Sequence, residues 1–433
     1  MRLQSILNPG MTVSFREAVD RGIATDGGLF MPVEIPTLSK DSVASMRSMT
    51  FVEIAFEVAR CLLAGDIPDA DLREVVEQSM TFPVPIRVIG DRTSVLELFH
   101  GPTLAFKDFG ARFMAQTMAY LHKNNTQERT ILVATSGDTG SAVAHGFHNV
   151  PGMKVCLLYP SRRVSAIQEL QLTSLKGNVT ALEIEGSFDD CQRLVKEAFA
   201  DTELSKEKRL TSANSINVAR LFPQTFYYFD AYAHRPDAGR PLAVSVPSGN
   251  LGNLTAGLMA WKMGLPVDRF IAATNMNDVL PRFLKSGVFA PGRSISTISN
   301  AMDVGNPSNF ARVTYLFGND VNNLRRILSS ASYSDEDTRR MIVGQFNENR
   351  YILDPHGAVA ALALRDHFGN DRGEYAGIIL ETAHPAKFMD TYEDRMKKEI
   401  EVPERLRTMM LGTKHSVKLT ARYNDLKMFL MND

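Results

Sequence analysis

The order of apolar and polar positions after residue 130 alternates between two kinds of segment. Short apolar runs typical of buried strands are followed by longer stretches with helical periodicity. The runs are ILVAT (131–135), KVCLLYP (154–160), LAVSVP (242–247), RFIAATN (269–275) and AGIILE (376–381), and the helical stretches are SAVAHGFHNV (141–150), VSAIQELQLTSL (164–175) and LTAGLMAWKMG (254–264). This alternation predicts an α/β fold with a mostly parallel sheet and helices on both faces. In such sheets ligands bind in the loops beyond the carboxyl ends of the strands.

The first ninety or so residues do not follow that alternation. The stretches SFREAVDRG (14–22) and FVEIAFEVARCLLAG (51–65) predict helices, so we expect a largely helical N-terminal region. We divide the chain into this N-terminal region (1–90), a smaller α/β domain (91–210) and a larger α/β domain with C-terminal helices (211–433).

Composition narrows the possible functions. Hydrophobic residues make up 44% and charged residues 22% of 433 residues, enough for two or three domains with a buried core. The formal net charge of −1 supplies no long-range field for nucleic acid or an anionic membrane, and no apolar run approaches a membrane span. Cys61, Cys156 and Cys191 give neither a disulfide framework nor a zinc spacing, which suits a reducing compartment. We expect a cytoplasmic protein without metal, nucleic-acid or membrane partners.

One lysine has an unusual setting, in HGPTLAFKDFG (100–110). Lys107 follows the apolar run Leu104, Ala105 and Phe106, and glycines enclose the stretch. A desolvated amine loses its proton more easily and can then attack a carbonyl or act as a base. The alternative is an amphipathic lysine lying along a surface groove.

Two loops that follow predicted strands suit anions. SGNLGN (248–253) opens a helix, and its glycines and free amides suit a lone phosphate group. The loop lacks the Lys-Ser/Thr of a nucleotide-binding P-loop and does not match GxGxxG. TSGDTG (135–140) offers the hydroxyls of Thr135, Ser136 and Thr139 to a carboxylate, and an N-cap turn is the alternative.

Two further segments carry polar groups at the ends of elements. Thr382 ends the last predicted strand, where its hydroxyl can bond a ring nitrogen without forcing it to be protonated. His384, in the same loop, is best interpreted as a turn cap. Asn214 and Arg220 lie in SANSINVAR (212–220), where the arginine fork suits a second anion and a solvated helix end is the alternative.

Together these groups match the needs of one cofactor. A lysine amine, a phosphate cradle, a carboxylate loop and a neutral partner for a ring nitrogen are the parts that a pyridoxal 5'-phosphate enzyme requires. A nicotinamide site would not call for the lysine, and a P-loop would need different residues.

The chain resembles the threonine synthase family, in the fold-type II (tryptophan synthase β-like) group of pyridoxal-phosphate enzymes. The similarity runs nearly end to end, through VSFREAVDRGIATDGGLFMP (13–32), HGPTLAFKDFGARF (100–113), ATSGDTGSAVAHGF (134–147), SANSINVAR (212–220), SVPSGNLGNLTAG (245–257), AATNMNDVLPRFL (272–284), SNAMDVGNPSNFAR (299–312), DPHGAVAAL (354–362) and TAHPAKF (382–388). The order and spacing of these motifs are highly specific. The resemblance implies two parallel-sheet α/β domains with the cofactor between them.

The resemblance also implies roles for individual residues. Lys107 would form the Schiff base with the cofactor, Thr382 would bond the pyridine nitrogen, and Asp138 would lie near the ring hydroxyl. The cofactor phosphate would lie in the cradle of Ser248, Gly249, Asn250, Leu251, Gly252 and Asn253. The substrate carboxylate would be held by Thr135, Ser136 and Thr139, and the substrate phosphate by Asn214 and Arg220.

Three positions depart from related sequences. The cysteine-synthase branch has Asn in place of Asp138, which argues against that branch. Leu251 stands where relatives often have Phe, a packing change that leaves the backbone cradle intact. Gly357 often is Thr in relatives, so any contact from that hydroxyl would be missing.

The implied reaction converts O-phospho-L-homoserine and water to L-threonine and phosphate, as the last step of threonine biosynthesis. The nearest alternatives are a serine or threonine dehydratase, a β-replacement enzyme, or a phospho-lyase that releases 2-oxobutyrate and ammonia. A metabolite-binding protein without catalysis is the alternative from another class. We expect a monomer or a homodimer.

Overall fold

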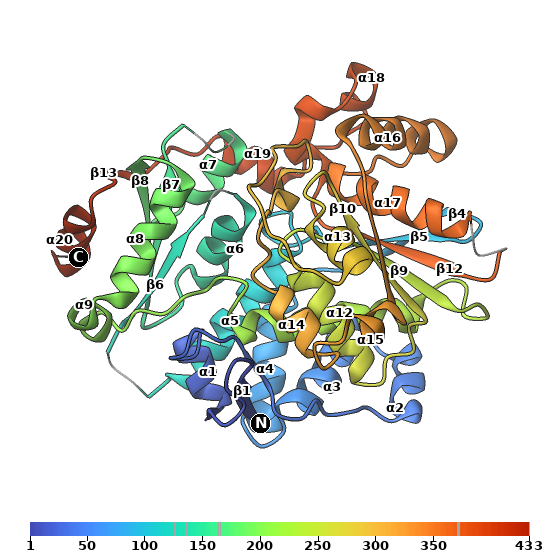
Figure 1. Cartoon of the computed structure of the whole chain (residues 1–433). Coiled ribbons are helices and arrows are strands. Elements are labelled where there is room, and N and C mark those ends of the chain that lie inside the picture. Colours follow the sequence, from blue (N-terminus) through green and yellow to red (C-terminus); the bar gives the residue numbers. More distant parts are fainter. Residues whose placement is uncertain (125–126, 136, 163, 165, 370–372, 433) are drawn as a thin grey trace.

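Two parallel sheets dominate the computed structural model, which describes residues 1–124, 127–135, 137–162, 164, 166–369 and 373–432 (Figure 1). The larger sheet has the order β11-β10-β9-β12-β5-β4. Its strands are β4 (Ile86–Gly90), β5 (Thr93–Glu97), β9 (Leu242–Pro247), β10 (Arg269–Thr274), β11 (Leu328–Ser332) and β12 (Ala376–Glu381). All neighbours are parallel except β4 and β5, which form an antiparallel edge.

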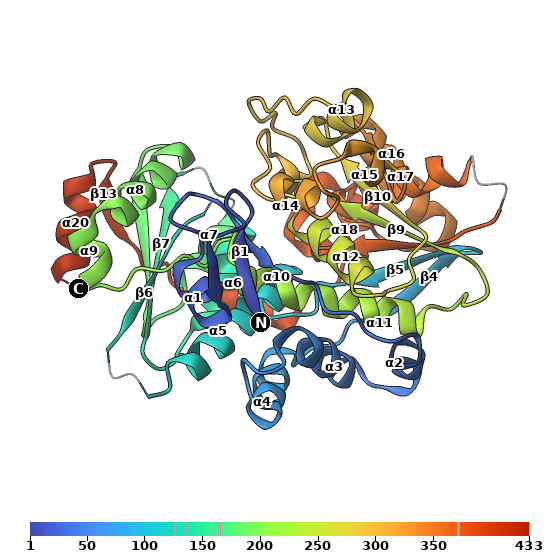
Figure 2. The same cartoon turned by 60° about the horizontal axis from the view of Figure 1, so that its bottom comes forward.

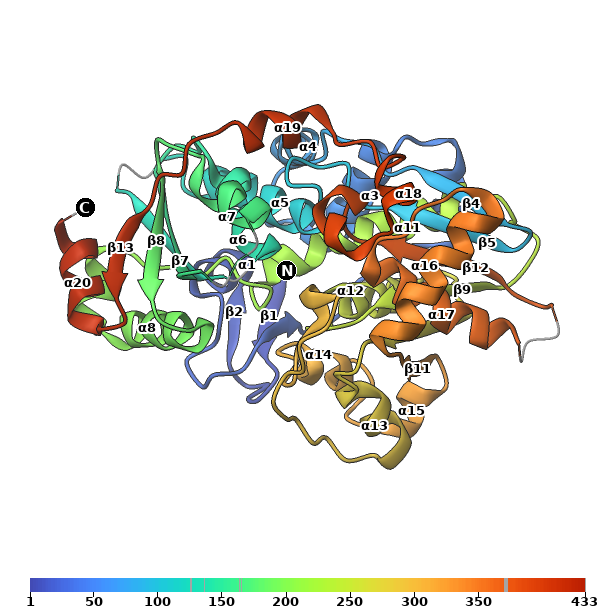
Figure 3. The ribbon, with the colours of Figure 1, turned by 90° about the horizontal axis from the view of Figure 1, so that it is seen from above.

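The smaller sheet is parallel throughout, in the order β13-β8-β7-β6. Its strands are β6 (Arg129–Ala134), β7 (Met153–Pro160), β8 (Val179–Glu185) and β13 (Val417–Thr420). β13 reaches this sheet after the chain has passed through the larger one. Figure 3 shows the segment from α18 (Asp394–Lys397) through α19 (Glu404–Met410) running across the molecule to β13.

Both sheets are covered on two faces, because successive strand residues point to opposite sides. In β9, Val244 and Val246 pack in one core with α11 (Phe226–His234) and α12 (Gly252–Lys262), whereas Ala243 packs in a second core with α17 (Pro355–Phe368). In the smaller sheet, Ile131 faces α5 (Lys107–Leu121) and α6 (Asp138–Phe147), and Leu132 faces α8 (Phe188–Ala200) and α20 (Tyr423–Asn432). The predicted α/β class with mostly parallel sheets is confirmed.

The predicted elements occur within a few residues of their expected positions. The five apolar runs form β6, β7, β9, β10 and β12, and the three helical stretches form α6, α7 (Ala166–Thr173) and α12. The other helices outside the N-terminal region are α9 (Thr202–Glu207), α10 (Val218–Leu221), η2 (Phe222–Thr225), α13 (Val279–Ser286), η3 (Asn300–Met302), α14 (Phe310–Tyr315), α15 (Val321–Arg325), α16 (Asp335–Asn349) and η4 (Pro385–Thr391).

The N-terminal region contains the predicted helices α1 (Phe15–Arg21) and α3 (Phe51–Leu63), together with α2 (Lys40–Ser45), η1 (Met46–Ser48) and α4 (Asp69–Ser79). Capping boxes begin α1, at Ser14 and Glu17, and α3, at Thr50 and Glu53. α3 packs on α11 and α4 on α5, so these helices lie beneath the larger units (Figure 2). A small antiparallel sheet of β1 (Arg2–Ser5), β2 (Thr12–Ser14) and β3 (Phe30–Pro32) was not predicted.

Among the described residues, none of the helices combines the length and apolar character that crossing a bilayer requires.

Candidate active site

Lys107 is the first residue of α5, and the chain just before it is paired with the segment after β12. The backbone N–H of Phe106 donates to the carbonyl of Thr382 at 2.9 Å, and that of His384 donates to the carbonyl of Leu104 at 3.0 Å. Leu104 has a φ of 58°, in the left-handed region, and turns the chain toward α5. Lys107 and Thr382, which lie far apart in the sequence, are therefore close neighbours.

The surroundings of Lys107 disfavour the protonated, charged form of its amine. Burial lowers the pKa of the Lys107 amine, and the nearby cations of Lys387 and Arg220 lower it further. Asp138 acts in the opposite direction. The Lys107 amine is thus set to release a proton more readily than a surface lysine, as a nucleophile or base requires.

Asp138 begins α6, after β6 of the smaller sheet, and it is paired with a lysine from the larger sheet's side. Nζ of Lys387 lies 2.5 Å from Oδ1 of Asp138, and Nε2 of Gln168 donates to the same oxygen at 3.4 Å. Burial alone would raise the pKa of Asp138, but the cations of Lys387 and Lys107 outweigh it and hold that pKa well below its usual range. The carboxylate is therefore ionised beside Lys107.

Lys387 is a charged group of the site that sequence reasoning missed. It lies in TAHPAKF, one of the motifs that carry the resemblance, but no loop or strand rule singles it out. Its partner comes from the other sheet. The only available signal was its place five residues after Thr382.

The loop after β6 is shaped by one of its own hydroxyls. Oγ1 of Thr135 donates to the carbonyl of Gly137 at 3.1 Å and accepts from the N–H of Gly140 at 2.9 Å. Thr139 is half-buried at the start of α6. Ser136 lies outside the described residues. The role of the three hydroxyls as carboxylate ligands stays a prediction, and Thr135 is already engaged within the loop.

The loop after β9 leads directly into α12 and is closely packed. A Cβ on Gly249 would lie 2.6 Å from the Cα of Met302, so this position requires glycine. Leu251, with a φ of 61°, is 3% exposed and is the last residue before α12, which begins at Gly252. Oγ of Ser248 donates to the carbonyl of Val246 at 2.8 Å.

The side chains of the two asparagines in this loop, Asn250 and Asn253, make different hydrogen bonds. Asn250 is tied to its surroundings, because its Nδ2 donates to Oγ of Ser215 at 2.7 Å and its Oδ1 accepts from the N–H of Ser308 at 2.6 Å. Asn253 is held by its oxygen, which accepts from the hydroxyls of Tyr227 at 2.9 Å and Tyr228 at 2.7 Å. Its Nδ2 is buried, and no hydrogen-bond partner for it lies in the part of the chain that the structure describes. A buried donor left free at a helix start fits an anion that completes its hydrogen bonds.

The loop and Lys107 are connected through aromatic packing. Phe109, two residues after Lys107 on α5, packs edge-on against Tyr227 with ring centroids 5.2 Å apart. Tyr227 in turn holds Asn253. The helix that begins at Lys107 and the loop after β9 are therefore connected by direct contacts.

Arg220 is buried near α5, the helix that Lys107 begins. It is 3% exposed, its Nη1 donates to the carbonyl of Ala213 at 2.7 Å, and its Nε makes no hydrogen bond with any described residue. Burial lowers the pKa of Arg220 to about 10, against the opposing effect of Asp108. Asn214 is half-buried in the preceding loop. The alternative of a solvated helix end does not hold for Arg220, because the side chain is buried.

Thr382 directly follows β12 and is 6% exposed. His384, two residues on, is the N-cap of η4, and its Nδ1 accepts from the N–H of Ala386 at 3.1 Å. The interpretation of His384 as a turn cap is confirmed.

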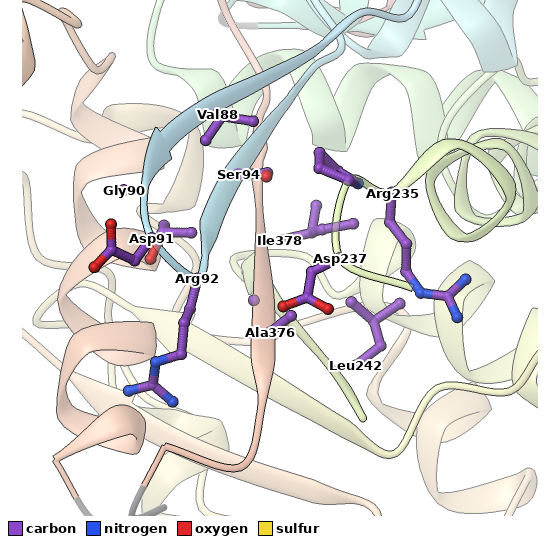
Figure 4. A pocket seen from close by; sticks show the side chains of 13 residues that line it. Val88, Gly90, Asp91, Arg92, Ser94, Arg235, Asp237, Leu242, Ala376 and Ile378 are labelled. Atoms are coloured by element: carbon purple, nitrogen blue, oxygen red, sulfur yellow. The ribbon is translucent and has the colours of Figure 1, made fainter. Parts of the chain in front are cut away.

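A separate cavity of about 40 Å³ lies elsewhere, by the turn between β4 and β5 (Figure 4). It is lined by Arg92, Arg235, Asp237, Leu242 and Ala376 among others. Leu242 and Ala376 are the first residues of β9 and β12, so the cavity is at the amino ends of these strands. Ligands of parallel sheets bind at the carboxyl ends, and the volume suits little more than water.

Comparison with protein families gives three matches along the chain. Residues 94–378 match the pyridoxal-phosphate dependent enzymes. Residues 7–80 match the threonine synthase N terminus, and residues 357–430 match the threonine synthase C-terminal region.

Individual relatives are similar over their full length. The chain is 44% identical to threonine synthase from Serratia marcescens, covering 100% of this chain and 99% of the relative. The crystal structure of threonine synthase from Escherichia coli superposes with a TM-score of 0.92 at 43% identity, covering 100% of both chains. A pyridoxal-phosphate-bound threonine synthase from Brucella melitensis superposes with a TM-score of 0.93 at 34% identity, covering 100% of this chain and 99% of the other.

Proposed function

Because the chain belongs to the threonine synthase family of pyridoxal-phosphate-dependent enzymes, we propose that it converts O-phospho-L-homoserine and water to L-threonine and phosphate. The observation that carries the proposal is the half-buried Lys107 at the start of α5, whose amine is desolvated, together with the packing of Phe109 and Tyr227 that connects this helix to the glycine loop after β9. Full-length similarity to threonine synthases supports the same activity. We further propose that the reaction takes place in the cytoplasm.

The residues present fit pyridoxal phosphate. The unpartnered Nδ2 of Asn253 and the amides at the start of α12 would hold its phosphate. Lys107 would bind its aldehyde carbon, and the hydroxyl of Thr382 would face its ring nitrogen. When bound, the cofactor supplies an electron sink for the charge left after a carbon loses its proton. A neutral hydroxyl at the ring nitrogen makes that sink milder than a carboxylate would.

Proton transfer falls to Lys107. Its amine, disfavoured as an ammonium by burial, would take the proton from Cα of the substrate and pass it on before it takes a proton from Cβ. The Cγ–O bond then breaks, phosphate leaves, and Cγ gains a proton to become the methyl group. Water adds its hydroxyl at Cβ, its remaining proton goes to the phosphate, and Lys107 returns one proton to Cα. One base would serve all of these proton transfers because Lys107 is fixed at the start of α5, beside the bound substrate. Exclusion of water between the sheets would strengthen each charge interaction.

Binding of the substrate's two anions would use two different elements. The start of α6 would receive the carboxylate through its amides and the hydroxyl of Thr139, since the Thr135 hydroxyl already donates to Gly137. Arg220 would receive the phosphate with its free Nε, and Asn214 would assist from the same loop. Both anions are then oriented before proton transfer begins.

The test is product analysis with the purified holoenzyme. Incubation with O-phospho-L-homoserine should release threonine and phosphate in equal amounts. Release of 2-oxobutyrate and ammonia would instead favour the phospho-lyase or dehydratase. Lys107→Ala should lower turnover by about a thousandfold or more and abolish the visible band of the bound cofactor. A fully active Lys107→Ala variant would refute the assignment.

A further inference from the structure

A buried ion pair joins the two sheets beside Lys107. Lys387 comes from η4, after β12 of the larger sheet, and Asp138 from α6, after β6 of the smaller one. Their Nζ and Oδ1 atoms are 2.5 Å apart, and the side chains are 1% and 4% exposed. Nζ of Lys387 also donates to the carbonyl of Thr103 at 3.0 Å. A buried ion pair adds little net stability over an apolar pair, so stability alone does not account for this one.

Charged groups surround Lys107 from several elements. Asp138 faces it from α6, Lys387 from η4 and Arg220 from α10. His356, on α17, also acts on Asp138. In the described part of the chain, the ion pair of Asp138 is with Lys387 and not with Lys107.

The other carboxyl group near Lys107, that of Asp108, already accepts hydrogen bonds from another residue. Asp108 follows Lys107 on α5, but its oxygens accept from the N–H and the hydroxyl of Thr103, each at 2.8 Å. Burial raises the pKa of Asp108 to about 6. Asp108 is thus held by Thr103, and Asp138 is the carboxylate whose charge favours the ammonium form of Lys107.

We propose that Lys387 is a positioning residue that keeps the Lys107 amine uncharged by holding Asp138 in an ion pair. The inference rests on the proposed function. Without Lys387, the Asp138 carboxylate would pair with the ammonium form of Lys107. An amine must lose that proton before it attacks an aldehyde or removes a proton from carbon. Lys387 adds a second positive charge beside Lys107, which disfavours the ammonium further.

The test measures capture of pyridoxal phosphate, not turnover. The full-length chain is freed of cofactor, and the rate constant for appearance of the visible band is followed from pH 6 to 10. Lys387→Met should lower the rate at pH 7 by about tenfold or more and move the midpoint to higher pH. Lys387→Arg keeps the charge and should retain the wild-type midpoint. The double variant Asp138→Asn, Lys387→Met lacks both charges, and its pH midpoint should return toward the wild-type value.

Controls separate this role from a structural one. Lys427→Met removes a lysine that pairs with Asp201 at 2.8 Å on the surface, and its profile should match the wild type. A merely structural ion pair would change stability, measured by thermal unfolding, but not the pH midpoint. Equal midpoints in the wild type, Lys387→Met and the double variant would overturn the inference while leaving the proposed function intact. A wild-type chain that forms no visible band would overturn both.

Discussion

Glu381 occupies the space beside Gly357. It is fully buried, its Oε1 accepts from the backbone N–H of Asp354, and its Oε2 has no hydrogen-bond partner among the described residues. A Cβ on Gly357 would lie 1.5 Å from that Oε2. A side chain at position 357 would require Glu381 to move, so in this chain the carboxyl group from β12 fills the space beside Gly357.

The same carboxyl group lies in a buried cluster with Asp354. The Asp354 carboxylate accepts from the N–H of His356 at 2.6 Å, from its Nδ1 at 2.5 Å and from the N–H of Ala383 at 3.2 Å. Burial raises the pKa of Glu381 well above its ordinary 4.5, and the charges of Asp354 and Glu97 raise it further.

Glu381→Gln should therefore change the dependence of stability on pH. The raised pKa means that the native state holds its proton more tightly than the unfolded chain. The stability linked to this proton is complete below about pH 4.5 and is lost as the pH rises toward the native pKa. Since glutamine cannot ionise, Glu381→Gln should become more stable relative to the wild type as the pH rises. The difference in Tm between the variant and the wild type should increase by about 2 °C or more from pH 5 to pH 8. Melting curves whose Tm difference stays constant across this range would contradict the interpretation.

Sequence alone could predict which loops meet, but not these buried pairs. Asp138 and Thr382 follow predicted strands at their carboxyl ends, and Lys107 joins them because the cofactor that these loops suit requires a lysine amine. The sequence does not single out Lys387 and Glu381, because their roles depend on Asp138 and Asp354. These partners are distant in the sequence and become neighbours only in the folded structure.

At the scale of elements, the anion cradle depends on how β9 passes into α12. Leu251 takes a left-handed φ that sequence rules assign to glycine or asparagine, and its side chain is buried as an anchor. The glycines of this loop indicated the turn. The pair of tyrosines on α11 that orient Asn253 could not be foreseen, because α11 follows no predicted strand.

Asn253→Asp should weaken binding of pyridoxal phosphate. The carboxylate can still accept from Tyr227 and Tyr228, but it replaces the free Nδ2 donor by an oxygen with negative charge. We expect the Kd for the cofactor to rise by about tenfold or more, measured by titration of the visible band. Tyr228→Phe is the matched control, because Tyr227 still holds Asn253, and its effect should be smaller. An unchanged Kd for Asn253→Asp would remove this residue from the cradle.

At the scale of the whole molecule, one buried arginine fastens the N-terminal region to the rest. Arg312 of α14 is fully buried. Its Nη2 donates to the carbonyls of Phe30 in β3, at 3.1 Å, and Ile216, at 2.6 Å, while its Nη1 donates to Oδ1 of Asn309 at 2.9 Å. Burial lowers the pKa of Arg312 to about 9. The N-terminal sheet thus meets both the loop of Arg220 and the segment that holds Asn250.

Arg312→Met should destabilise the fold and loosen the N-terminal region. The carbonyls of Phe30 and Ile216 would lose their donor in a dry environment, at about 1–3 kcal/mol for each buried group. We expect the free energy of unfolding in urea to fall by about 3 kcal/mol. Limited proteolysis should then cleave the first eighty residues faster than in the wild type. Unaltered unfolding and cleavage would show that this contact is not needed for docking.

The parallel pairing of β13 with β8 has a consequence for how the protein is made. Leu182 of β8 is aligned with Val417 of β13, and Leu426 and Leu430 of α20 cover the same apolar face. On the ribosome, β8 emerges long before β13, so its edge and the leucines beside it stay uncovered while the entire larger sheet is still being translated. Open edges of this kind recruit foreign strands. Nascent chains should therefore need chaperone protection during that interval.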